Sequence, residues 1–80
     1  MRLDDFLSTV GVVKRRTVAK EMAANGLIQI NGQRAKPAAD VHLNDIIAIK
    51  GSRPVTVEVL RIPSGSVAKD ERDRFVRTLD

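Results

Sequence analysis

The spacing of apolar residues changes once along this chain, and that change restricts the folds open to it. In the first part, apolar side chains recur at i, i+3, i+4 and i+7, the spacing of one helix face. Beyond residue 26 they alternate with polar side chains, which is the spacing of a strand with one buried face. Helices followed by strands are typical of the α+β class. The sequence therefore predicts two helices packed on a small antiparallel β-sheet.

Both predicted helices are short and have recognisable ends. The first begins near residue 3 and stops at Gly11, and the second covers about residues 15–25. Asn25-Gly26 supplies the left-handed exit common at helix C-termini. Two short helices with a tight connector resemble a helix-turn-helix arrangement. Their predicted buried faces are Leu3, Phe6, Leu7 and Val10 in the first helix, and Val18, Ala19, Met22 and Ala23 in the second.

Three strands are predicted after the helices. Ile28 and Ile30 alternate with polar residues, and Asn31-Gly32 signals a tight turn, belonging either to a hairpin or to a sharp bend. Residues 33–44 are polar and are predicted to form a loop. The other two strands are residues 46–50 and residues 55–60, the latter with Val55, Val57 and Val59 on its buried face.

Pro63, Ser64 and Gly65 mark a predicted boundary. We expect one folded unit over residues 1–62, followed by a C-terminal linker and helix over residues 63–80. The C-terminal helix is predicted to have about three turns and to begin near Ser66, with a thin apolar set. That set consists of Phe75, Val76 and Leu79.

Composition excludes several classes of function. Eighty residues make one domain with little core to spare for an enclosed active site, and the chain has no cysteine. His42 is the only histidine, so we expect no metal, no cofactor and no catalytic residue. Asp4, Asp5, Asp40 and Asp45 are interpreted as caps and turns. The chain lacks a signal peptide and a membrane-spanning stretch, so we expect a cytoplasmic protein.

Positive charge is concentrated between residues 14 and 36. That segment carries six basic residues and one acidic residue, a balance of +5, whereas the rest carries eight basic and nine acidic residues, a balance of −1. A single electropositive region on a small domain is typical of polyanion binding. Phe6 and Phe75 are the only aromatic residues and both sit at apolar-periodic positions. Because no aromatic platform remains to stack unpaired bases, we expect recognition of the backbone and shape of structured RNA.

Candidate RNA contacts follow from the placement of the cations. Arg16 and Lys20 lie one helical turn apart and share a face. Lys14 and Arg15 lie at the entrance of the second helix, where free backbone N–H groups also favour phosphate. Thr17 either donates its hydroxyl to phosphate or caps a helical turn. Asn31 serves the tight turn and is a candidate RNA contact as well. Two further candidates follow that turn, Arg34 and Lys36.

Four short motifs, in order, resemble the RNA-binding S4 domain, also called the αL motif, which is named after a small-subunit ribosomal protein. They cover roughly residues 1–60. They are Arg2-Leu3-Asp4, Arg16-Thr17-x-Ala19-Lys20, Gly26-x-Ile28-x-Ile30-Asn31-Gly32 and Asn44-Asp45-x-Ile47. MRLD-x-FL and KRRT-x-AKE are similar to the small ribosome-associated quality-control proteins related to the heat-shock S4 factor. We expect this stand-alone form because the domain begins at Met1 and few residues follow it.

The resemblance implies a non-enzymatic protein that binds ribosomal RNA of large subunits still carrying peptidyl-tRNA. It also implies that Arg2 lies on the binding surface, although Arg2 alternatively forms a salt bridge with Asp4 or Asp5. Possible further partners are the peptidyl-tRNA and a quality-control protein, and we expect a monomer. The heat-shock factor has a longer basic C-terminal extension, whereas residues 66–80 here carry equal numbers of basic and acidic residues. Extra RNA contacts are therefore not expected there.

Three other functions remain open from the sequence. The two helices could form a DNA-binding helix-turn-helix-like module, although the second helix offers no Asn or Gln for base readout before Asn25. The chain could also be a constitutive ribosome-assembly factor. Finally, its C-terminal helix could dock a protein partner.

Overall fold

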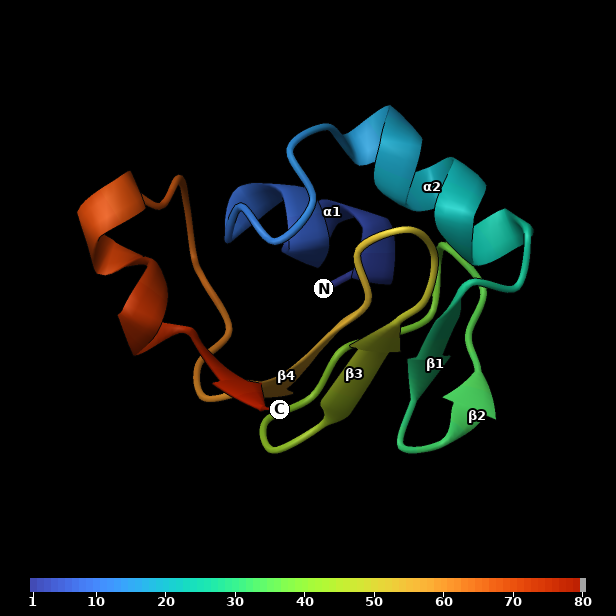
Figure 1. The fold of residues 1–80 in the computed structure, drawn as a ribbon. Helices are drawn as coiled ribbons and strands as arrows, with labels where there is room; N and C mark the ends of the chain where they lie inside the picture. Colours follow the sequence, from blue (N-terminus) through green and yellow to red (C-terminus); the bar gives the residue numbers. More distant parts are fainter. Residues whose placement is uncertain (80) are drawn as a thin grey trace.

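The computed structural model describes residues 1–79 (Figure 1). Its strands form one antiparallel sheet in the order β2-β1-β3-β4-β5. The helices α1 and α2 lie together on one side of this sheet, so the predicted α+β class is confirmed. The elements are α1 (Leu3–Thr9), α2 (Arg16–Ala24), β1 (Ile28–Ile30), β2 (Gln33–Arg34), β3 (Ile46–Ile49), β4 (Val55–Val59), the 3-10 helix η1 (Lys69–Arg74) and β5 (Val76–Leu79). No helix within residues 1–79 is long and apolar enough to cross a bilayer.

The core lies between α1 and the inner face of the sheet. The apolar stripe of α1 is fully buried, as the spacing of its residues predicts. Alternate residues of the central strands face this stripe, among them Ile47 of β3 and Val57 of β4, which are paired in register. Burial of each large apolar side chain contributes about 1.5–3 kcal/mol, so this layer fixes the position of α1 on the sheet.

The predicted buried face of α2 is wrong at Val18. The helix buries Ala19 and Ala23, and Met22 is partly buried, but Val18 remains 42% exposed. Successive residues of a helix differ in direction by about 100°, so Val18 and Ala19 cannot both point at a narrow contact. The small side chains of Ala19 and Ala23 form that contact, which leaves Val18 facing solvent.

The Asn31-Gly32 turn forms a hairpin, one of the two geometries that the sequence left open. Both residues have positive φ, 53° and 82°, as a two-residue hairpin turn requires. Antiparallel pairing of Ile30 with Gln33 follows directly. The prediction of an uninterrupted loop over residues 33–44 is therefore wrong at its start, because Gln33 and Arg34 form β2.

The C-terminal segment differs from the predicted three-turn helix. A short helix is present, but it is the 3-10 helix η1, and β5 follows it. Strand β5 pairs with β4, placing Val76 beside Val59, and both side chains are buried. The run of charged residues in η1 buries no side chain, whereas Val76 gains a buried position by joining the sheet. Tertiary burial therefore outweighs helical propensity here.

The loop between β2 and β3 caps the N-terminus of α1. The backbone N–H of Leu3 donates to the carbonyl of Ala39 at 2.8 Å, and that of Asp4 donates to the carbonyl of Pro37 at 3.1 Å. Arg2 forms an isolated antiparallel bridge with Asp40. Free N–H groups at a helix start need acceptors, and here a distant loop provides them. This contact fixes Arg2 and Asp4 next to the β2–β3 loop.

Candidate nucleic-acid interface

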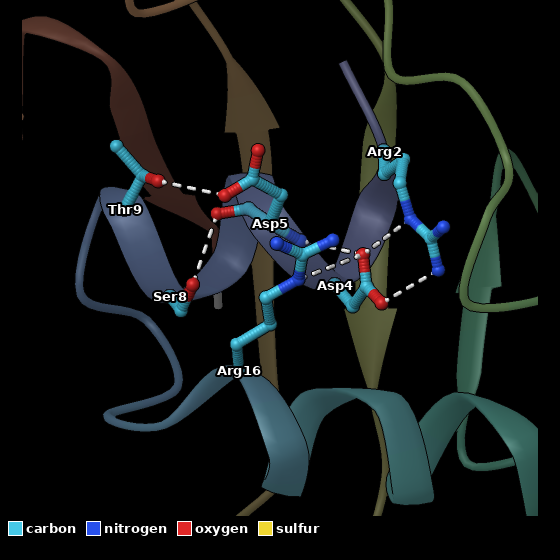
Figure 2. Close-up of polar contacts among 6 residues, drawn as sticks. All are labelled: Arg2, Asp4, Asp5, Ser8, Thr9 and Arg16. Atoms are coloured by element: carbon cyan, nitrogen blue, oxygen red, sulfur yellow. Dashed lines mark hydrogen bonds and ion pairs between the residues drawn. The ribbon is translucent and has the colours of Figure 1, made fainter. Parts of the chain in front are cut away.

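Asp4 lies at the centre of a small ionic cluster on α1 (Figure 2). Its side chain is 1% exposed, yet both of its carboxylate oxygens have partners. Arg2 Nε donates to Oδ1 at 3.1 Å and Arg2 Nη2 donates to Oδ2 at 3.0 Å. This paired geometry is the strong form of an arginine–carboxylate contact and fixes the plane of the guanidinium group.

Arg16 reaches the same carboxylate from the start of α2. Its Nε lies 3.7 Å from Asp4 Oδ1, which is an ion pair rather than a hydrogen bond. The side chains of Arg2 and Arg16 are 46% and 51% exposed, so a large part of each faces solvent. One buried acid thus holds two half-exposed guanidinium groups together and connects the two helices. We call these three residues the Asp4 clamp.

Opposing influences set the pKa of Asp4. Burial raises the pKa, but the hydrogen bonds from Arg2 and from the Asp5 backbone N–H, together with the charges of Arg2 and Arg16, outweigh burial and lower it. The hydrogen bond to Asp4, and then its charge, raise the pKa of Arg2. Asp4 is therefore ionised and Arg2 is charged at neutral pH. The clamp as a whole keeps a net positive charge.

The remaining predicted contacts at the α2 entrance lie on the exposed surface. Arg15 has extended backbone dihedral angles and directly precedes the helix, so Arg16 is its first residue. Lys14, Arg15, Thr17 and Lys20 are all exposed. The structure thus brings Arg2 next to the start of α2, a proximity that periodicity alone does not provide.

Arg34 and Lys36 lie at the other end of α2. Arg34 Nη2 donates to the carbonyl of Ala24 at 3.2 Å, where the last carbonyls of the helix attract cations. Gly26 makes this approach possible, because a Cβ at that position would lie 3.0 Å from Arg34 Cζ. Lys36 and Arg34 line one side of a recess of about 570 Å³ that also includes Ala23 and Ala24.

Asn31 connects the hairpin turn to the start of β3. Its Nδ2 donates to Asp45 Oδ1 at 2.9 Å, and its Oδ1 accepts the Ile46 backbone N–H at 2.9 Å. These bonds occupy one of the two amide hydrogens and one oxygen lone pair. An RNA contact by Asn31 stays a prediction, and its structural role in the turn is clear.

His42 is 75% exposed, and its Nδ1 lies 3.8 Å from Asp45 Oδ2. Asp45 also accepts the His42 backbone N–H at 2.8 Å, so it organises the turn before β3. In the described residues 1–79, no cluster of three or more histidine, aspartate or glutamate side chains could hold a metal ion.

The sequence allowed a salt bridge between Arg2 and Asp4, and the structure contains it. The contact that sequence reasoning missed is the second one, from Asp4 to Arg16. A weak signal was present: Asp4 adjoins the apolar stripe of α1, where an acidic side chain needs a buried partner. Its partner Arg16 comes from the next helix, and periodicity within α1 gives no information about that residue.

Comparison with known proteins identifies relatives over most of the chain. The S4 domain family matches residues 1–47. The Bacillus subtilis protein named RQC P-site tRNA stabilizing factor is 48% identical over 60 residues, which cover 74% of this chain and 70% of that protein. The Streptococcus pneumoniae protein of the same name is 41% identical over 71 residues, covering 88% of this chain and 81% of that protein.

A solved structure has the same fold. It is described as the trimeric structure of Vibrio cholerae Heat Shock Protein 15, and it aligns with a TM-score of 0.89 and 29% identity over 99% of this chain and 81% of that chain. The resemblance drawn from the four short motifs is thereby confirmed. With a family match over more than half of its length and relatives above 40% identity, the chain belongs to the S4 domain family.

Proposed function

We propose that this chain is a non-enzymatic RNA-binding protein that binds ribosomal RNA of the large ribosomal subunit. Its role is the rescue or quality control of stalled subunits that carry peptidyl-tRNA. Membership of the S4 domain family supports RNA binding. The name RQC P-site tRNA stabilizing factor, borne by relatives 41% and 48% identical, supports the ribosomal role. Such a role belongs in the cytoplasm, where ribosomes translate.

The Asp4 clamp carries the proposal. Its two guanidinium groups are half exposed and both contact one buried carboxylate, which lies between them (Figure 2). Arginine side chains can bind phosphate oxygens in pairs of hydrogen bonds, and positioning them in advance reduces the entropy that binding would cost. The free N–H donors of Arg2 and Arg16 therefore suit two nearby phosphates of folded RNA.

The neighbouring residues extend this surface in the proposal. Lys14, Arg15 and Lys20 supply further charge around the start of α2, and Thr17 supplies a hydroxyl donor. If four or five phosphates are neutralised, log affinity falls with log salt at a slope of roughly −3 to −4.5. The contacts proposed at the other end of α2 are Arg34 and Lys36, with Asn31 in the turn.

A sedimentation experiment tests the function. Purified protein is mixed with empty large subunits, with large subunits carrying peptidyl-tRNA, and with small subunits, and bound protein is measured over a range of salt. We expect binding to large subunits, strongest when peptidyl-tRNA is present, with the salt slope given above. Equal binding to empty large subunits would favour the alternative of an assembly factor.

Competition with duplex DNA tests the nucleic-acid class. Structured ribosomal RNA should displace the protein from subunits far better than DNA of equal length, because the surface offers cations rather than base-reading side chains. If duplex DNA competes better, the protein is a DNA-binding module instead.

Light scattering of the free protein tests our expectation of a monomer. The test matters because the structure of the Vibrio cholerae relative is described as trimeric.

A further inference from the structure

The turn between β3 and β4 lies beside the C-terminal end of α2. The backbone N–H of Lys50 donates to the carbonyl of Leu27 at 2.7 Å, and Leu27 comes three residues after the helix ends. Pairing of Ile28 with Ile49 holds the two segments together. The turn comprises residues 50–54 and contains Lys50 and Arg53, which are both exposed. Neither residue is among the RNA contacts proposed above.

Four cations therefore gather around this end of the molecule. Arg34 is tied to the last turn of α2 through the carbonyl of Ala24, and Lys36 lines the adjoining recess. Arg53 is three residues from Lys50, so their Cα atoms are at most about 10 Å apart. We call Arg34, Lys36, Lys50 and Arg53 the turn-end cations.

Little negative charge opposes the turn-end cations. Residues 24–36 and 50–54 together contain four basic residues and no acidic residue, a balance of +4. The nearest acidic residue in α2 is Glu21, one helical turn before Asn25. None of the four cations forms an ion pair within residues 1–79. Four unpaired cations repel one another, which is a cost that a bound polyanion removes.

We propose that the turn-end cations form a second phosphate-binding site for RNA backbone, with Lys50 and Arg53 as contacts additional to the proposed interface. The nine residues of α2 separate Arg16 from Ala24 by about 12 Å along the helix. One phosphate cannot contact both ends. The Asp4 clamp and the turn-end cations thus hold two separate stretches of backbone, either of one ribosomal RNA or of ribosomal RNA and the bound tRNA. This inference rests on the proposed function.

The double variant Lys50→Gln/Arg53→Gln tests the site. Large subunits carrying peptidyl-tRNA are the probe, and affinity is measured as salt rises. We expect the salt slope to flatten by roughly one to two units. Between roughly 50 and 200 mM salt, the wild type should then lose up to about tenfold more affinity than the variant. Both positions are exposed, so thermal unfolding should remain close to that of the wild type.

A matched control removes the same charge elsewhere. Arg61→Gln/Lys69→Gln also replaces two exposed cations, but next to β5 at the edge of the sheet. Lys69 begins η1, and the backbone N–H of Arg61 donates to the carbonyl of Phe75, which follows η1. This control should keep the wild-type slope. Hydroxyl-radical footprinting then identifies the RNA: Lys50→Gln/Arg53→Gln should lose one group of protected nucleotides, in ribosomal RNA or in tRNA, and retain the group that Arg16→Ala loses.

The outcomes separate the two proposals. If Arg16→Ala weakens binding while Lys50→Gln/Arg53→Gln keeps the slope and footprint of the wild type, the second site is wrong and the proposed function stands. The second site is also wrong if both double variants flatten the slope equally, because only net charge then matters. If the wild type does not bind subunits at all, the proposed function fails and takes the second site with it.

Discussion

The junction of α1 with α2 and the C-terminal segment are both rich in charge, but they arrange it in opposite ways. At the junction, one buried acid serves two arginines, so positive charge remains facing solvent. In the C-terminal segment each pair is one to one: Arg74 pairs with Glu71, and Arg77 pairs with Glu58 across β4 and β5. The number of arginines is therefore a poor guide to a binding surface. The burial and sharing of their partners decide how much positive charge stays exposed to solvent.

The largest expected effect comes from Asp4→Asn. The substitution keeps the shape of the side chain but removes the charge that strengthens its hydrogen bonds to Arg2, so we expect a loss of about 1–3 kcal/mol in the free energy of unfolding. RNA affinity should fall as well, although the protein gains one positive charge. Urea unfolding and subunit binding measure the two effects. Higher affinity in Asp4→Asn would show that net charge, and not positioning, governs the junction.

The effect of Asp4→Asn on the free energy of unfolding should depend on pH. The folded-state pKa of Asp4 is lowered, so its contribution to stability is present above its unfolded pKa of about 3.9 and is lost as pH falls through the lower folded value. The stability difference between wild type and Asp4→Asn should be constant from neutral pH to about pH 5 and shrink on further acidification. Unfolding curves at several pH values check this. If the stability difference between wild type and Asp4→Asn widened in acid, the pKa of Asp4 could not be lowered in the folded state.

In the C-terminal segment the main contribution is apolar. Val76→Ala removes two methyl groups from a side chain that is buried where β5 meets β4, at a cost of about 1.5 kcal/mol. RNA affinity of the folded protein should not change, since the substitution leaves every proposed contact in place. Chemical unfolding and subunit binding below the melting temperature separate the two. Weaker RNA binding by Val76→Ala would show that β5 contributes to the RNA interface. The C-terminal segment would then not differ from the α1–α2 junction in this respect.

Arg16→Ala and Arg77→Ala form a matched pair of substitutions, because each removes one half-exposed or exposed arginine from an ion pair. Arg16→Ala should flatten the salt slope by about one unit and weaken binding broadly across RNA sequences, by roughly tenfold. Arg77→Ala should leave the slope unchanged. Titration of the two variants in parallel measures the difference. Equal salt slopes for the two variants would show that an arginine sharing a buried acid contributes no more to RNA binding than one in a one-to-one pair.

The smallest expected effect is on the stability of Arg77→Ala. The Arg77–Glu58 pair lies on the outer face of the sheet, where solvent screens it, so its removal should cost under about 1 kcal/mol. Added salt should reduce even that difference. Thermal unfolding at low and high salt tests both statements. A loss as large as that of Asp4→Asn would mean that the exposed pair and the buried clamp are energetically alike.

Local features of the fold were predictable from sequence because each depends on neighbouring residues. The apolar stripe of α1, the glycine exit at Gly26 and the Asn31-Gly32 turn all follow from spacing or backbone preference. The 3-10 helix and β5 were not predictable in the same way. Phe75, Val76 and Leu79 fit either a helix or a strand, and the choice depends on pairing with β4. That contact is distant in sequence.

The candidate site shows the same division. Its cations were visible as a charge imbalance, and the cluster at the start of α2 was predicted from helical geometry. The Arg2–Asp4 salt bridge was one of two alternatives for Arg2, but the sharing of Asp4 with Arg16 was not predicted. That sharing depends on the packing of α1 against α2 and on the loop that caps α1. The predicted burial of Val18 was wrong for a related reason. Of the four apolar positions on α2, only those that a neighbouring element covers are buried.

The loop that caps α1 has a consequence for the order in which the protein can be assembled during its own synthesis. The clamp residues Arg2, Asp4 and Arg16 leave the ribosome early, whereas the carbonyl groups of Pro37 and Ala39 that complete the first turn of α1 emerge later. A nascent chain that stops before this loop lacks the acceptors for the backbone N–H groups of Leu3 and Asp4. The capped first turn of α1, on which the Asp4 clamp is built, is therefore complete only after more than a third of the chain has been translated.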